Sequence, residues 1–434
     1  MRKAISLVLF ISGALALILI LASFFPKYMG MLLFLAVFLM GDLVLWLLVR
    51  AWIKRRGKPL KLLLPTLFWL PATVLFCMVI AGLFIPFISW NVTAKAILLS
   101  LLLMTIISKM IPLILNLLSR LVRLVASGLF ATGISWLRWV DISSWLLGSV
   151  VWLTMLTGMI VWAYDFKVVT VDVRSPKIPA SFENFRIVQV SDIHLGNWIR
   201  KQKLIEAIGM MNSLKPDLVV FTGDMFTYSS TEGQDFISYL KQIKARYGVY
   251  AVLGNHDYGD YVKWESPVAK QINFTELKDF YHELGWKLLL NSSAVIRLGN
   301  DSINILGVEN WGAKRRFQRY GDISKAGAGI NKSCFSILLS HDPSYWDSII
   351  SKQHPEVDLT LSGHTHGGQV GIEDGSLRWS IISAITPLWG GLYLRKKDGL
   401  TSTLYVNEGL GTVGYSGRIG IRPEITLIIL HTSE

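Results

Sequence analysis

Five short apolar segments in the second half of the sequence each end in a small cluster of polar residues. The segments cover residues 185–190, 217–221, 249–253, 335–339 and 357–361, and they are rich in the β-branched and aromatic residues that favour strands. The clusters that follow them are Ser191-Asp192-Ile193-His194, Thr222-Gly223-Asp224, Gly254-Asn255-His256-Asp257, Ser340-His341-Asp342 and Ser362-Gly363-His364-Thr365-His366. Because ligands bind at the carboxyl ends of strands in open α/β sheets, we expect these side chains to form one site.

The residue types in these clusters predict a metal site. Asp, Asn and neutral His offer oxygen and nitrogen ligands suited to Mn, Fe, Zn or Ni, and the absence of nearby Cys argues against a structural zinc site. Two metals about 3.5 to 4 Å apart need roughly seven protein ligands, which the strand ends supply. The candidates are Asp192, His194, Asp224, Asn255, His341, His364 and His366. One residue separates Asp192 from His194, and one separates residue 364 from residue 366. Extended backbone would place both ligands of each pair on one face.

Several other polar residues have an ordinary alternative role. Asp257 and Asp342 each follow a candidate histidine, where they would either orient that histidine or cap a turn, and the sequence leaves both options open. Most lone histidines are simply core or surface residues, and we interpret His282, His354 and His431 in this way.

Helical patterns separate some of the predicted strands, for example at residues 203–214 and 234–246. Alternation of strands and helices is typical of a layered α/β domain. We therefore predict that residues 165–434 form one α/β domain, which is long enough to bury its own core.

Residues 1–164 have a different character, with apolar runs at 4–25, 29–49, 62–87, 96–118 and 143–163. Each run is close to the ~20 residues that a transmembrane helix needs to cross a hydrocarbon core. The first run could instead be a signal peptide, although no small-x-small cleavage site follows it. We predict an N-terminal α-helical membrane bundle of about five helices. Asp42 and Lys109 lie inside these runs, where charges are either functional or paired structurally.

The distribution of Lys and Arg predicts the orientation in the membrane. Basic residues are concentrated at 50–61 and 120–138, whereas the other two connections contain only Lys27 and Lys95. The positive-inside rule then places both basic segments in the cytoplasm. With five crossings, the α/β domain would lie on the outer, periplasmic face of the cytoplasmic membrane. An interfacial helix within residues 119–141, or a miscount by one crossing, would reverse this localisation.

Charge also argues against nucleic acid as a partner. The net charge is +13, but residues 1–164 contain 14 of the 43 Lys and Arg and only two of the 30 acids. The α/β half, which would have to contact phosphate backbones, is therefore close to neutral. Membrane lipids are the expected partners of the basic, apolar half.

The order Asp-x-His, Gly-Asp, Gly-Asn-His-Asp, lone His and Gly-His-x-His resembles the calcineurin-like metallophosphoesterase superfamily over residues 184–430. Within it, the segments 363–369, 407–411 and 423–425 resemble the bacterial membrane-associated YkuE-like branch. The resemblance implies a two-sheet α/β/β/α sandwich. It also implies one metal bound by Asp192, His194, Asp224 and His366, and another bound by Asp224, Asn255, His341 and His364. The five-helix front exceeds the single anchor that this branch leads us to expect.

These observations together predict a membrane-anchored dinuclear-metal phosphoesterase. It would hydrolyse a phosphomonoester or phosphodiester by attack of a metal-activated water, with His256 as the acid and Asp257 as its orienter. No phosphate-binding Gly-x-x-x-x-Gly-Lys loop or nucleophile elbow is present, so ATP-dependent transfer and serine hydrolysis are unsupported. The alternative is a metal-binding membrane scaffold or sensor without turnover. A transporter is less compatible with helices that are so poor in polar residues.

Residues 379–397 suggest an amphiphilic, envelope-associated substrate. This stretch is apolar without regular period, it contains Pro387 and Gly390-Gly391, and it ends in Arg395-Lys396-Lys397. Trp and Tyr beside basic residues suit the headgroup region of a bilayer. Alternatively, Ile381, Ile385 and Leu388 fold beneath a sheet as core. Phospholipids, lipid-linked sugar phosphates, nucleotide-sugar lipids and cell-wall polymers all remain open as substrates.

Overall fold

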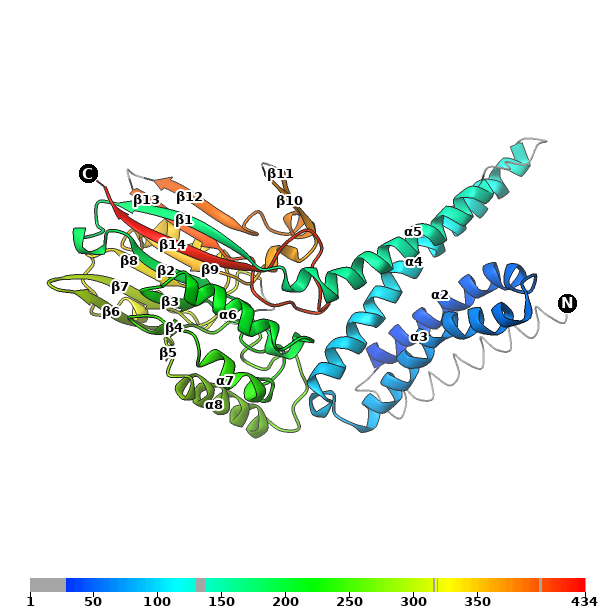
Figure 1. Ribbon diagram of the computed structural model, residues 1–434, viewed down its shortest axis with the longest axis horizontal. Helices are drawn as coiled ribbons and strands as arrows, with labels where there is room; N and C mark the ends of the chain where they lie inside the picture. The colour runs from blue at the N-terminus through cyan, green and yellow to red at the C-terminus, as the bar shows by residue number, and fades with distance from the viewer. Residues whose placement is uncertain are drawn as a thin grey trace. The chain divides into compact units, whose positions relative to one another are not determined.

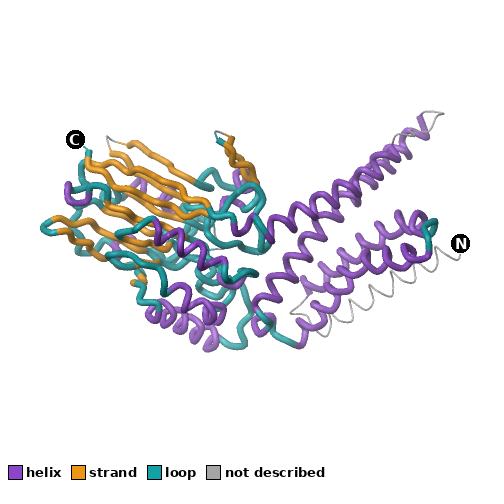
Figure 2. The backbone as a smooth tube through the Cα atoms, in the orientation of Figure 1, coloured by secondary structure: helices purple, strands orange, loops and turns teal. Residues whose placement is uncertain are grey.

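The computed structural model describes residues 29–129, 137–314, 317, 319–375, 377–397 and 400–433. The chain divides into two compact units. The first contains Met1–Asn91 and Leu98–Leu156, and the second contains Val92–Ile97 and Thr157–Glu434. Figure 2 shows that the described strands all belong to the second unit.

Four long helices correspond to four of the expected apolar runs: α2 Met29–Ile53, α3 Lys58–Phe84, α4 Val92–Leu129 and α5 Leu137–Ile160. Each contains a stretch that is long and apolar enough to cross a membrane. The remaining run, 4–25, lies outside the described residues. Residues 119–129 continue α4 without interruption, so they do not form the separate interfacial helix that was the alternative for this segment.

The two charged residues inside the predicted apolar runs, Asp42 and Lys109, are paired in the first unit. Lys109 of α4 donates from Nζ to Oδ2 of Asp42 in α2 at 2.8 Å, and to the carbonyl oxygen of Phe68 in α3 at 2.9 Å. Because an isolated charge within a bilayer is costly, this pairing gives both residues a structural role.

The second unit is built on two six-stranded mixed sheets (Figure 1). The first sheet has the order β1 Lys167–Ser175, β14 Glu424–Thr432, β2 Phe185–Val190, β3 Leu218–Phe221, β4 Val249–Ala251 and β5 Lys287–Leu288. The second has the order β12 Gly391–Lys397, β13 Leu400–Val406, β9 Leu359–Ser362, β8 Ser336–Leu339, β7 Asp301–Gly307 and β6 Ser292–Leu298. Strands β2 to β5 run parallel, as do β7, β8, β9 and β13.

The core lies between these sheets and on both of their outer faces. Side chains such as Ile187 and Val220 of the first sheet pack against Ile337 and Leu361 of the second. Helices α6 Lys203–Ser213 and α8 Pro267–Glu283 cover the outer face of the first sheet. The outer face of the second is covered by the short helices α9 Ile323–Ala326 and α10 Ser351–Gln353 with the π-helical turn between Trp346 and Ile350. This arrangement confirms the predicted α/β/β/α sandwich.

Two details differ from the sequence pattern. The five predicted strands are divided between the sheets, with β2, β3 and β4 in the first and β8 and β9 in the second. The helix expected at 234–246 is reduced to a 3₁₀ segment, Ser230–Phe236, followed by the single-turn helix α7 Ile237–Leu240. A separate hairpin, β10 Gly371–Asp374 with β11 Leu377–Ser380, belongs to neither sheet.

Candidate metal centre

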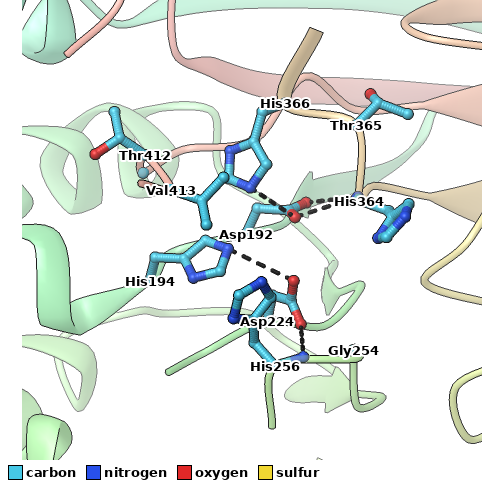
Figure 3. A network of polar contacts seen from close by, with 12 residues as sticks. Asp192, His194, Asp224, Gly254, His256, His364, Thr365, His366, Thr412 and Val413 are labelled. Carbon is cyan, nitrogen blue, oxygen red and sulfur yellow. Dashed lines mark hydrogen bonds and ion pairs between the residues drawn. The ribbon is translucent and has the colours of Figure 1, made fainter. Parts of the chain in front are cut away.

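All seven predicted metal ligands lie in the loops that follow β2, β3, β4, β8 and β9. Because these strands meet at adjoining ends of the two sheets, residues as distant in sequence as Asp192 and His366 converge (Figure 3). Six of the seven side chains are buried, and His364 is partly exposed, as is the neighbouring His256. The sequence clusters therefore converge on one site.

The local backbone of this site is unusual. Asp192, His194, Asp224, His364 and His366 all have positive φ, between 47° and 74°. Non-glycine residues rarely adopt this left-handed conformation, and such residues gather at functional sites where the surrounding structure maintains the strain. The expectation of extended backbone across the ligand pairs 192/194 and 364/366 was therefore wrong. The ligands converge because each loop reverses sharply after its strand.

One group of side chains contains Asp192, His194 and His366, whose ligand atoms lie within 4.8 Å of one another. His366 Nε2 is 3.2 Å from Asp192 Oδ1. The backbone N–H of His364 donates to Asp192 Oδ2 at 2.9 Å, which fixes the orientation of this carboxylate. Gly363 precedes it at a point where a Cβ atom would collide with the side chains of Ser191 and Asp192.

A second group contains Asp224, His341 and His364, again within 4.8 Å. Asp224 Oδ2 lies 3.2 Å from His341 Nε2 and 3.5 Å from His194 Nε2, so this carboxylate adjoins both groups. The Nδ1 atom of His341 lies 2.8 Å from the carbonyl oxygen of Thr222, which leaves Nε2 directed at the cluster. The two groups correspond to the two halves of the ligand set expected from the family resemblance.

Two atoms of the cluster have the properties of unsatisfied metal ligands. His194 Nε2, which faces the Asp224 carboxylate, and Asn255 Oδ1 are buried and form no hydrogen bond with any described residue. Buried polar atoms are normally paired, because desolvation without a partner costs on the order of 1 to 3 kcal/mol. Divalent cations bound by nitrogen and oxygen donors would satisfy them, so the residues fit such ions.

The electrostatics of the cluster also favour a positive charge beside Asp224. Burial alone would lower the pKa of His341, but the Asp224 carboxylate outweighs burial and raises this pKa to about 10. Burial would raise the pKa of Asp224, yet the neighbouring histidines hold it well below its usual value. A bound cation would supply the positive charge that a protonated His341 imidazole otherwise provides beside Asp224.

His256 lies beside the cluster, and its orientation is determined by residues that the sequence did not reveal. Its Nδ1 atom is 2.9 Å from the carbonyl oxygen of Thr227, and the ring of Tyr261 stacks on its imidazole. The hydroxyl of Tyr261 also accepts a hydrogen bond from Asn255 Nδ2 at 2.7 Å. Burial lowers the pKa of His256 to about 4. Tyr261 follows the Gly-Asn-His-Asp motif in the same loop, but no spacing rule distinguishes it there.

The Asp257 carboxylate binds the backbone of the site, whereas the partner of His256 Nδ1 is the Thr227 carbonyl oxygen. This carboxylate accepts hydrogen bonds from the backbone N–H groups of Asp224, Met225, Phe226 and Gly254 at 2.8 to 3.2 Å. Burial and the adjacent Asp224 raise its pKa to about 7. Asp257 therefore ties together the two loops that carry Asp224 and Asn255. Asp342 caps the turn at Ser344 and approaches His364 Nε2 at 3.7 Å.

Arg418 is a second residue that the sequence analysis missed. It is fully buried and donates to the carbonyl oxygens of Glu408, Gly409 and Gly411 at 2.7 to 2.9 Å, and to that of His366 at 3.3 Å. These bonds connect the C-terminal segment to the turn that carries His366. Arg418 lies between the segments 407–411 and 423–425, which resemble the YkuE-like branch. This position in the sequence could have indicated that Arg418 supports the site.

The sequence of this chain is similar to those of known phosphoesterases. The family described as calcineurin-like phosphoesterase matches residues 185–368. A Danio rerio transmembrane protein with a metallophosphoesterase domain is 32% identical over 281 residues, which are 63% of this chain and 59% of the relative. The chain thus spans about three-fifths of that relative. The Bacillus subtilis metallophosphoesterase YkuE is 32% identical over 273 residues, 60% of this chain and 84% of the relative.

A third relative carries a specific enzymatic name. The UDP-2,3-diacylglucosamine pyrophosphatase LpxG of Chlamydia muridarum is 30% identical over 290 residues, which are 56% of this chain and 83% of the relative. The four spans and the similarity to a transmembrane relative indicate a membrane protein. The family match at residues 185–368 covers the motifs that hold the candidate metal ligands. The relatives confirm the family resemblance. The chain belongs to the calcineurin-like phosphoesterase family.

Proposed function

We propose that this protein is a membrane-anchored, metal-dependent phosphoric ester hydrolase with a dinuclear centre. The position of Asp224 carries the proposal, because one carboxylate oxygen lies 3.5 Å from His194 and 3.2 Å from His341. A carboxylate between two ligand groups is what a bridged pair of cations requires. In this proposal residues 1–164 form the membrane region of about five helices, and residues 165–434 form the catalytic domain.

The proposed ligand set uses all seven residues that the sequence predicted as metal ligands. Asp192, His194 and His366 would hold one cation, Asn255, His341 and His364 the other, and Asp224 both. The mixed nitrogen and oxygen donors are compatible with Mn, Fe, Zn or Ni. When bound, such a pair activates water at neutral pH and stabilises charge on phosphoryl oxygens.

His256 is the proposed proton donor to the leaving group. With Nδ1 facing the Thr227 carbonyl oxygen, its Nε2 atom is the nitrogen free to exchange a proton with substrate. Because burial holds the pKa of His256 at about 4, its ring is neutral at pH 7 before substrate binds. An anionic phosphoryl group beside it would favour protonation. Asp257 contributes by holding the loop that carries His256.

The proposed substrate is a phosphoester of a lipid or of another molecule in the cell envelope. The name of LpxG describes a pyrophosphatase acting on a diacylated sugar nucleotide, and the described part of this chain contains four helices that can cross a membrane. The positive-inside distribution of Lys and Arg supports a location in the cytoplasmic membrane with the catalytic domain on the outer face. An amphiphilic substrate at the bilayer would be accessible to a domain held there.

Metal analysis and hydrolysis assays on the full chain in detergent test this proposal. We expect two bound divalent ions and hydrolysis of an aryl phosphomonoester or phosphodiester. Asp224→Asn should lose metal from both groups and abolish turnover, whereas Asp301→Asn on the β6–β7 hairpin should retain both. Two bound metals and full activity in Asp224→Asn would refute the site. Bound metal without turnover on any phosphoester would instead favour the scaffold or sensor.

A further inference from the structure

The β10–β11 hairpin has one mainly apolar and one charged face. Ile372 pairs directly with Trp379 across the two strands, and on the same face Leu377 pairs with the exposed Asp374 next to the turn. Glu373 pairs with Arg378 on the opposite face. Figure 1 shows this hairpin as a separate ribbon outside both sheets.

The charged face of the hairpin is turned toward the domain. Glu373 forms an ion pair with Lys167 of β1, and Arg378 Nη2 donates to the buried Glu408 carboxylate at 2.6 Å. The guanidinium of Arg378 also stacks over the ring of Trp389 at 4.7 Å. All four charged side chains, Lys167, Glu373, Arg378 and Glu408, form one connected ion network.

The apolar face is therefore directed outward. Ile372, Leu377 and Trp379 are 49%, 58% and 52% exposed. The following 3₁₀ turn adds Ile381 and Ile385, at 56% and 62%. Sheets at the surface of a soluble domain ordinarily have the opposite polarity, with apolar residues inward. We call these five residues the apolar face.

The interpretation of Ile381 and Ile385 as core beneath a sheet was wrong. Of the three residues in that alternative, only Leu388 packs against the core of the second sheet. Ser380 Oγ instead donates to the carbonyl oxygen of Gly367, so the start of this turn is attached to a segment outside both six-stranded sheets. The described residues leave the apolar face uncovered.

The chain positions this face beside the end of a membrane span. The stretch that can cross a membrane ends at Tyr164, three residues before Lys167, and Lys167 holds Glu373 of the hairpin. Three residues of extended backbone reach at most roughly 11 Å. Trp162 and Tyr164 at the end of the span are residue types that anchor at the membrane–water interface.

Charge next to the apolar face also suits a lipid surface. The hairpin adjoins the start of β12, where Arg378 Nη1 donates to the Gly390 carbonyl oxygen at 3.4 Å. The outward side of β12 carries the exposed Leu392, Leu394 and Lys396. Apolar side chains beside a cation match acyl chains beneath lipid phosphate.

We propose that the apolar face inserts into the headgroup and acyl-chain boundary of the bilayer that anchors this chain. The contact would hold the Gly367 turn, and with it the adjacent His366, at the level of the lipid headgroups. This contact does not depend on the proposed hydrolytic function, and it is measurable without turnover.

Lipid-dependent fluorescence quenching in the full chain tests the insertion. In a Cys77→Ser/Cys334→Ser background, Leu377→Cys and Ile385→Cys would each carry an environment-sensitive fluorophore, with one chain per nanodisc of phosphatidylcholine and phosphatidylglycerol. The matched control is Val295→Cys, an exposed apolar position on β6, at the opposite edge of the second sheet from β12. Lipids with spin labels on their acyl chains serve as quenchers.

We expect at least twofold stronger quenching at residues 377 and 385 than at residue 295. Equal quenching at all three positions would overturn the proposal. Nanodiscs that hold two chains test for contact between copies. Quenching between the two labels there, with no quenching by the lipid, would assign the apolar face to a second copy of the chain and would also overturn the proposal. Two labelled positions guard against a local distortion at either one.

Discussion

The ring of Tyr261 stacks on the imidazole of His256, with ring centroids 3.9 Å apart and planes inclined by 9°. The same tyrosine accepts a hydrogen bond from the amide nitrogen of Asn255. That bond leaves the buried amide oxygen of Asn255 as the atom available to a cation. One side chain thus positions both a proposed metal ligand and the proposed acid, and its two contacts are separable by mutation.

Tyr261→Phe keeps the stacked ring but removes the hydroxyl that orients Asn255. We expect roughly 10-fold weaker metal binding, at the low end of the range for partners that orient a metal ligand, with the turnover of metal-saturated protein nearly unchanged. Tyr261→Ala should lower turnover as well, because His256 loses its stacking partner. Chelator competition and kcat at saturating metal separate the two effects. Tyr320→Phe is the control, and parent-like metal affinity in Tyr261→Phe would contradict the positioning role.

His256→Ala tests the proposed acid directly. We expect unchanged metal content and turnover reduced by roughly 10²- to 10⁴-fold, the usual range for the loss of a general acid. The reduction should be smaller for nitrophenyl esters than for alkyl esters, because nitrophenolate leaves without a proton. Steady-state kinetics with both leaving groups measure this difference. An equal reduction for the two would show that His256 acts in another way.

The position of the site was predictable because strand ends in α/β domains face one edge. Asp192, Asp224 and His364 each follow a short β-rich run, so their convergence could be inferred without knowing the strand order. The division of the strands between two sheets could not be inferred, since β3 and β9 are both short and fully buried although they belong to different sheets. Left-handed backbone at Asp192 and His364 also leaves no periodic signal, because it depends on contacts from other loops.

Residues that act through tertiary contacts were the ones that the sequence did not reveal. Arg418 looks like a surface cation, but four carbonyl oxygens, three in the segment 408–411 and one at His366, allow its burial. The hairpin has a related ambiguity, because the alternation of Leu377, Arg378 and Trp379 indicates two faces without telling which one is inward. Lys167 and Glu408, remote in sequence, determine that the charged face is inward.

The buried ion network predicts a pH dependence of stability. Burial and the neighbouring Glu408 raise the pKa of Glu424 to about 7, from an ordinary value near 4.5. The folded protein therefore keeps a proton that the unfolded chain releases, so this contribution to stability is complete below about pH 4.5 and is lost as the pH rises through about 7.

Glu424→Gln cannot titrate, so its Tm should fall less than that of the parent between pH 5 and pH 8. Thermal unfolding of the full chain in detergent with a chelator measures this difference without metal release at low pH. Glu265→Gln, at an exposed position, is the control and should follow the parent. Parallel curves for Glu424→Gln and the parent would contradict the raised pKa.

The proposed outer location is tested by reporter fusions in a bacterial host. Fluorescent protein exported through the general secretory route does not mature, whereas alkaline phosphatase is active only outside the cytoplasm. A fusion after Glu434 should therefore be phosphatase-active and dark. The same reporters inserted after Gly57, within the basic connection between α2 and α3, should give the opposite result. Fluorescence at Glu434 would mean that the number of crossings is even and that the domain faces the cytoplasm.

Insertion of the apolar face should affect which substrates reach the metal centre. This expectation depends on the proposed function as well as on the bilayer contact. Ser380 attaches the turn before Ile381 directly to Gly367, the residue after His366, so insertion of the face would keep the metals near lipid phosphates. A Leu377→Asp/Ile385→Asp variant should then hydrolyse a long-chain phospholipid ester in vesicles at least 10-fold more slowly than the parent. Hydrolysis of a small aryl phosphoester should be unchanged, because neither residue contacts the cluster. Val295→Asp serves as the surface control. An equal loss of activity on both substrates would indicate damage to the fold. Unchanged hydrolysis of the vesicle substrate would show that the apolar face does not bring the substrate to the site.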